Sequence, residues 1–127
     1  MNPKNKIQMK YIVLICTFFT AVPLTAQDFN EWISSAESSY DEKKYVESAE
    51  AYSSSFELSD GNARHYYNAA CSWALTGDTI QSIKYLELSA NSGYKNRDWA
   101  EKDTDLKSLH GHRQWKEIIA LMQTNKD

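Results

Sequence analysis

The chain has 127 residues, of which 42% are hydrophobic and 24% are charged, with only 4 Gly and 2 Pro. This length suits one small domain, with or without a processed segment, and excludes an enzyme with separate cofactor and substrate lobes. The hydrophobic content is too high for a disordered chain, and the shortage of Gly and Pro favours helices over a turn-rich β-sandwich.

The N-terminal segment, residues 1–27, has the pattern of a secretory signal peptide. Three lysines and no acid occupy its start, and an uncharged, largely apolar run follows, broken by Pro23 and ending in the small pair Thr25-Ala26. A basic start, an apolar stretch of about 7–15 residues and a small-residue exit are typical of secretion signals. We therefore expect cleavage after Ala26 or Gln27 and an exported bacterial protein, periplasmic or extracellular.

An uncleaved membrane anchor is the alternative for the same segment. A spanning helix needs about 20 apolar residues, whereas this run is shorter and contains Pro23 near its end. Cys16 is not expected to be a lipid acceptor, because bulky Ile15 precedes it where a lipoprotein signal has a small residue.

Without residues 1–27 the chain is acidic. All 17 acids follow Gln27, whereas 3 of the 14 basic residues precede it, which leaves 11 basic residues against 17 acids and a formal net charge of −6. We expect neither nucleic-acid binding nor membrane insertion of the processed chain, since it lacks a basic stripe. Cys16 would leave with the signal, so Cys71 would have no partner for an intramolecular disulfide.

The rest of the chain contains two similar segments, 29–60 and 63–94, that align without a gap at an offset of 34 residues. Large residues meet large ones, and small residues meet small ones. The matched pairs are Trp32 with Tyr66, Ala36 with Ala70, Ser48 with Ser82, Ala49 with Ile83, Tyr52 with Leu86 and Ser55 with Ser89.

Each segment divides into two predicted helices, because apolar residues recur at spacings of three and four. Gly77 is placed to end one helix in the left-handed conformation, and Asp78 to cap the next. Residues 59–62 (SDGN) have the composition of a turn between the two segments. The predicted helices span 30–42, 45–58, 63–75 and 79–91.

A helix–turn–helix period of 34 residues resembles the tetratricopeptide repeat. The second segment carries the resemblance best, with Tyr66 at the family's tryptophan position, Trp73 at its first tyrosine and Gly77-Asp78 at its turn. The chain departs from the family in having serine at both alanine positions of each second helix and no closing proline. The resemblance implies an all-α fold of helical-hairpin repeats.

Residues 97–127 do not repeat and are expected to cap the stack, because stacked repeats leave a hydrophobic face open at each end. Asp103 and Asp105 are placed to cap a one-turn helix bearing Leu106 and Leu109. The pattern D-x-D-L-x-x-L resembles a tail that follows the last repeat in bacterial tetratricopeptide proteins. A final helix then has an apolar stripe of Trp115, Ile118, Ile119 and Met122. The expected division of domain 28–127 is repeat 29–62, repeat 63–96 and cap 97–127.

The sequence contains no phosphate-binding loop, dinucleotide fingerprint, zinc-protease motif or serine-nucleophile motif. His110 and His112, with Asp103 or Asp105, form the one candidate set of metal ligands, but loop histidines are the simpler interpretation. Cys71 is expected to pack or to line a groove. We therefore expect no catalytic residue, no metal and no cofactor, with a metal-dependent enzyme as the alternative.

The resemblance also implies a binding site, because the concave surface of tetratricopeptide domains is lined by the first helix of each unit. Carried over residue by residue, the expected groove comprises Asn30, Ile33, Glu37, Tyr40, Asp41, Arg64, Tyr67, Cys71, Ala74 and Leu75. Tyr40 and Tyr67 are the expected anchors, with Glu37 facing Arg64. Most other aromatic residues, Trp99 among them, are expected in the core or at seams between helices.

The family's clamp for a C-terminal carboxylate is missing, because Ile33 and Glu37 replace its basic and amide residues and only Asn68 matches. The expected function is an exported, non-catalytic interaction module or assembly subunit that binds an unknown protein or peptide, or a second copy of itself. A membrane-anchored scaffold that keeps residues 1–27 is the alternative.

Cleavage and retention of the N-terminal segment predict different masses for the exported protein. We expect the intact mass of the exported protein to correspond to a chain that starts at Gln27 or Asp28. A mass that includes residues 1–26 would contradict cleavage and favour the anchor.

Overall fold

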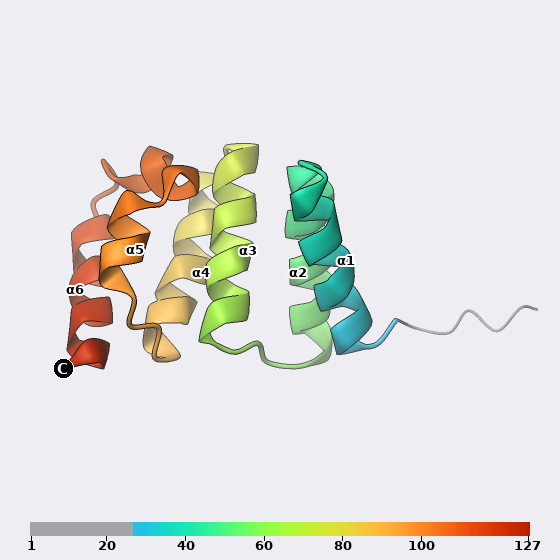
Figure 1. Cartoon of the computed structure of the whole chain (residues 1–127), viewed down its shortest axis with the longest axis horizontal. Helices are drawn as coiled ribbons and strands as arrows, with labels where there is room; N and C mark the ends of the chain where they lie inside the picture. Colours follow the sequence, from blue (N-terminus) through green and yellow to red (C-terminus); the bar gives the residue numbers. More distant parts are fainter. Residues whose placement is uncertain (1–26) are drawn as a thin grey trace, which may run out of the picture.

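The computed structural model describes residues 27–127, and every regular element within this range is a helix (Figure 1). Of the expected signal peptide, all but Gln27 lies outside the described residues. No helix in the described range is long and apolar enough to cross a membrane. The elements are α1 (Phe29–Asp41), α2 (Tyr45–Leu58), α3 (Ala63–Thr76), α4 (Thr79–Asn91), α5 (Arg97–Lys102), the 3₁₀ helix η1 (Thr104–Leu109) and α6 (Trp115–Lys126).

The helices form two hairpins and a C-terminal segment. In Figure 1, α1 packs along α2 and α3 along α4, and contacts between α2 and α3 join the two hairpins. The C-terminal segment covers the far side of the second hairpin, with α6 against α4, η1 against α3, and α5 in contact with both α6 and η1. The all-α prediction is confirmed, and the four repeat helices match their predicted bounds to within one residue.

Local signals explain where these helices begin and end. Gly77 ends α3 with φ 87°, and the side chain of Asp78 accepts a hydrogen bond from the Gln81 backbone N–H at 3.0 Å, so both sequence predictions are confirmed. The side chains of Asp28 and Asn62 cap α1 and α3 in the same way. Each cap satisfies a backbone donor that the first turn of a helix leaves free.

Two buried serines, one in each of the similar segments, make the same hydrogen bond. Ser48 Oγ donates to the carbonyl of Ala36 at 2.8 Å, and Ser82 Oγ donates to the carbonyl of Ala70 at 2.7 Å. Both residues of the second hydrogen bond follow those of the first by 34 positions, which is the repeat offset. A small side chain lets two helices cross closely, and a buried hydroxyl must find an acceptor. Serine meets both requirements.

The C-terminal segment supplies the second part of the core. The two leucines of η1, Leu106 and Leu109, are completely buried, and Asp103 caps this helix by accepting from the Asp105 backbone N–H at 3.1 Å. The predicted stripe of α6 is buried as well: Trp115, Ile118, Ile119 and Met122. Helix α5 was not predicted, because six residues are too few to show a helical period.

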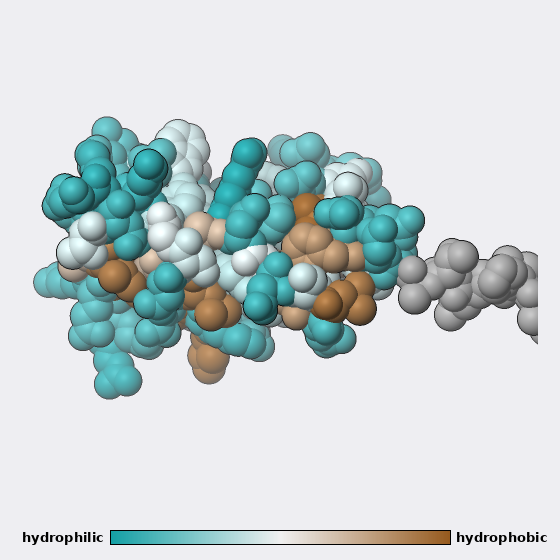
Figure 2. Space-filling model, turned by 90° about the horizontal axis from the view of Figure 1, so that it is seen from below, coloured by the Kyte–Doolittle hydropathy of each residue, from teal (hydrophilic) through white to brown (hydrophobic). Residues whose placement is uncertain are grey.

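The face of the molecule seen from below is largely hydrophilic, and its hydrophobic side chains form small, separate patches (Figure 2). Scattered apolar side chains of this kind are normal on a folded protein. The large exposed apolar residues of the described range are Val46, Leu58, Ile80, Leu88 and Trp99.

The end of α3 offers a test of the repeat turn. Gly77→Ala should lower the free energy of unfolding by about 1–2 kcal/mol, because a Cβ is disfavoured in the left-handed conformation. The cost is conformational only, since an added Cβ at Gly77 would meet no atom within 4 Å.

Gly111→Ala is the matched control, because Gly111 has the same open surroundings without a positive φ. Urea denaturation should show a loss for Gly77→Ala and little change for Gly111→Ala. Equal stability of the two variants would contradict this account of the turn.

Candidate functional site

A cleft of about 370 Å³ lies between the repeat helices and the C-terminal segment. Its walls come from α1, α2 and α3 on one side, and from α5 and η1 on the other. The lining residues are Glu37, Tyr40, Asp41, Tyr52, Arg64, Tyr67, Asn68, Cys71, Trp99, Asp103 and Asp105.

The structure brings six of the ten expected groove residues together in this cleft. They are Glu37, Tyr40, Asp41, Arg64, Tyr67 and Cys71. The other four lie outside it: Ile33 and Ala74 are buried in the core, Leu75 is half-buried near the end of α3, and Asn30 is exposed in the first turn of α1. Glu37 and Arg64 both line the cleft, but no ion pair joins them.

Sequence patterns did not predict the far wall of the cleft, which is the wall that α5 and η1 supply. Trp99 was expected in the core or at a seam; instead it is 55% exposed and lines the cleft from α5. Asp103 and Asp105 were expected as helix caps, and either one as a metal ligand beside His110 and His112, but neither was expected in the groove. Their short spacing did signal the start of a helix, but nothing local indicates that this helix docks against α3.

Phenol–carboxylate hydrogen bonds tie the two walls together. Tyr67 Oη donates to Asp103 Oδ2 at 2.7 Å, and Tyr40 Oη donates to Asp105 Oδ2. The thiol of Cys71 lies 3.7 Å from the same Asp103 oxygen. Helices α1 and α3 thus each hold one of the two carboxylates. We call the part of the far wall that these two acids make the floor of the cleft.

Burial disfavours the ionised forms of the phenols and the thiol in the cleft. It raises the pKa of the Tyr67 and Tyr40 hydroxyls and of the Cys71 thiol, and the nearby carboxylates raise all three further. Burial also raises the pKa of Tyr52 to about 12. A thiol must lose its proton to act as a nucleophile, so these surroundings disfavour that role for Cys71.

The carboxyl group of Asp105 is also perturbed. Burial and the negative charge of Asp103 raise its pKa above the usual value, while the hydrogen bond from Tyr40 lowers it. Burial is the largest of these effects. The ionised form of Asp105 is therefore less favourable in the folded protein than in the unfolded chain.

Three potential metal ligands lie near one another, but they are not the expected set. The ligand atoms of Cys71, Asp103 and Asp105 all lie within 4.8 Å of one another. A metal bound by this set would have to displace the proton of the Cys71 thiol, whose pKa is raised by burial. The histidines of the expected set lie elsewhere: the ring of His110 packs 4.5 Å from that of Trp115, and His112 accepts from the Gln114 backbone N–H.

A second hollow, of about 480 Å³, lies over α2, α3 and α4. It contains none of the expected groove residues, and its charged residues, two acids and Lys84, are mixed. The cleft that holds Asp103 and Asp105 is therefore the stronger candidate site.

Comparison of the chain with protein-family models, with curated proteins and with solved structures finds no match. The chemistry of the cleft is therefore argued from its own residues. Its distinguishing features are an exposed indole, several tyrosines, and an excess of acids over bases.

The hydrogen bond from Tyr40 to Asp105 can be tested by titrating the carboxyl group of Asp105. Tyr40→Phe should raise the pKa of Asp105 further, because it removes the hydrogen bond that favours the carboxylate. Since this pKa is already raised by folding, Asp105 favours the fold at low pH, and that contribution is lost as the pH rises through the folded-state pKa. In Tyr40→Phe, the stability that protonated Asp105 contributes should therefore be lost at a higher pH than in the wild type.

The measurement is the pH dependence of the side-chain carboxyl ¹³C shift of Asp105. Tyr45→Phe is the control, because the Tyr45 ring lies 5.7 Å from that of Tyr40 but makes no hydrogen bond through its hydroxyl within the described range. An Asp105 pKa unchanged by Tyr40→Phe would contradict the assigned role of the Tyr40 hydroxyl.

Proposed function

We propose that residues 28–127 form an exported interaction module of the tetratricopeptide type, which binds a segment of a partner protein in the cleft and catalyses no reaction. Two features that recur at the same offset support the repeat assignment: the bounds of the paired helices and the serine–carbonyl hydrogen bonds. Export rests on the signal-like pattern of residues 1–27.

The observation that carries the binding proposal is the exposed indole of Trp99 at the edge of a concave, tyrosine-lined cleft. Tryptophan and tyrosine are enriched among the residues that dominate binding energy at protein interfaces. A hollow of about 370 Å³ can enclose a few side chains but no folded domain. An extended or helical segment of a partner fits this size.

The state of the polar groups supports a binding role over catalysis. The Cys71 thiol has a raised pKa, and Asp103 and Asp105 accept hydrogen bonds from phenols. His110 and His112 do not line the cleft, so neither is placed to serve as a base for Cys71.

Substitution of Trp99 tests the binding proposal directly. Trp99→Ala should weaken partner binding by about 2 kcal/mol, or about thirtyfold, because an exposed indole anchor would be lost. Helicity should be unchanged, since the side chain is more than half exposed. The readout is crosslinked capture from envelope extract, followed by an affinity measurement on the retained protein.

Ile80→Ala is the matched control, because Ile80 is an 81% exposed apolar residue on α4 that does not line the cleft. Glu37→Lys supplies a second substitution within the cleft, at an exposed position on α1. A partner that binds wild type, Trp99→Ala and Glu37→Lys equally would rule out the cleft as the binding site.

A further inference from the structure

The cleft contains many more acids than bases. Its carboxylates are Glu37, Asp41, Asp103 and Asp105, and its basic residue is Arg64. Arg64 is exposed and forms no ion pair within the described range. The site therefore presents a negative potential to whatever enters it.

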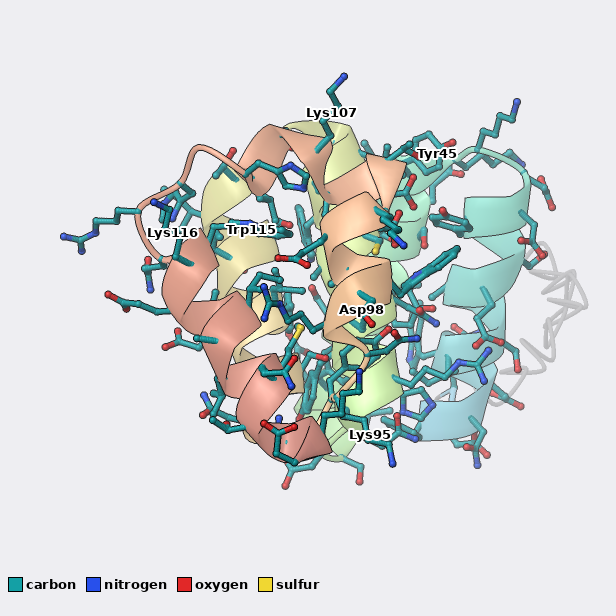
Figure 3. The ribbon with its side chains drawn as sticks, turned by 60° about the vertical axis from the view of Figure 1, so that its left-hand side comes forward. Tyr45, Lys95, Asp98, Lys107, Trp115 and Lys116 are labelled. Atoms are coloured by element: carbon teal, nitrogen blue, oxygen red, sulfur yellow. The ribbon has the colours of Figure 1, made fainter. Side chains whose placement is uncertain are left out.

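The two acids of the floor have no cationic partner in the part of the chain that the structure describes. The ion pairs found there involve other acids, namely Glu42, Glu101 and Asp98. Lys107 belongs to the same 3₁₀ helix as Asp105, but its side chain extends away from the molecule (Figure 3). Asp103 and Asp105 instead receive hydrogen bonds from neutral phenols, which leave their charges uncompensated.

Aromatic rings stand beside these charges. Tyr67 stacks on Tyr94 with ring centroids 4.3 Å apart, and Trp99 offers an indole that is 55% exposed. The face of an aromatic ring attracts a cation, most strongly when the ring is an indole and the site is shielded from water. The acids and the rings thus favour the same ligand, a cationic group with a flat or apolar surface.

We propose that the cleft receives an arginine side chain of the partner segment, with its guanidinium between the carboxylates of Asp103 and Asp105 and its flat face against Trp99. This inference rests on the proposed function and specifies the chemistry of the partner. It deepens that function without requiring any residue outside the cleft.

Arginine fits the cleft better than lysine for two reasons. Its planar fork carries five donors, so it can bind two neighbouring carboxylates at once. One carboxylate oxygen of Asp103 and one of Asp105 lie within 4.8 Å of each other. Guanidinium also stacks on aromatic rings and is less strongly hydrated than an ammonium group, so it enters a half-enclosed site more easily.

The full-length chain is expressed, and the protein is purified in the form that the cells accumulate, with or without residues 1–27. This protein is then titrated with a capped peptide of sequence Gly-Ser-Arg-Ser-Gly. Binding is followed by the indole N–H cross-peak of Trp99, assigned with Trp99→Phe. The arginine peptide should bind at least tenfold more tightly than the same peptide with citrulline, which keeps the shape and removes the charge. Rising salt should weaken binding.

Asp105→Asn should weaken binding of the arginine peptide at least fivefold, because it removes one of the two charges on the floor. The variant should keep its melting temperature, because the side-chain oxygen of asparagine can still accept the hydrogen bond from Tyr40. Glu87→Gln is the charge-matched control, because Glu87 is exposed on α4 and does not line the cleft.

Three results would overturn the inference: equal binding of the arginine and citrulline peptides, tighter binding of a lysine peptide, or binding that chelator abolishes and zinc restores. The proposed function fails separately. If Trp99→Ala abolishes capture of the partner but arginine shows no advantage over citrulline, the cleft binds a different chemistry and only this inference falls. If arginine shows no advantage and capture is unaffected by Trp99→Ala, both fall.

Discussion

The carboxylate of Asp103 connects the two halves of this protein. One of its oxygens accepts the Asp105 backbone N–H and so starts η1, while the other accepts the hydroxyl of Tyr67 and fixes that start against α3. The position of η1 then directs Leu106 and Leu109 into the core and Asp105 toward Tyr40. The cleft exists because a segment of non-repeating sequence is docked at this point.

The repeat hairpins provide the surface on which that docking occurs. Serine at the helix crossings allows close approach, and the hydroxyls of Ser48 and Ser82 each find a carbonyl of the partner helix, so neither is left unsatisfied. In the first hairpin, Ser48 also lies 2.9 Å from Ser72 Oγ of α3, which extends the polar contact between the two hairpins. Buried polar networks stabilise a fold only when every member is bonded, and these serines meet that condition.

The same burial gives the cleft its chemical character. Phenols and a thiol whose pKa values are raised remain neutral, so they donate to the acids without cancelling their charge. The result is an acidic, aromatic site. Its negative potential disfavours an acidic peptide end as a ligand.

The sequence alone determined much of the helical frame. Apolar spacing and the Gly77-Asp78 pair located α1 to α4, and the stripe that begins at Trp115 located α6, because these are local signals with periods that a helix must obey. Six of the ten residues that the family resemblance assigned to a groove line one cleft, since residues on one helix face share surroundings. The sequence could not place α5, which is too short to show a period.

Only the tertiary structure decided the far wall of the cleft. The bonds from Tyr67 to Asp103 and from Tyr40 to Asp105 join residues 36 and 65 positions apart. No local pattern predicts such pairings, because they depend on how a non-repeating segment packs against helices of both hairpins. For the same reason the exposure of Trp99 and the concentration of negative charge on the cleft floor follow from packing, whereas the identities of these residues follow from the sequence.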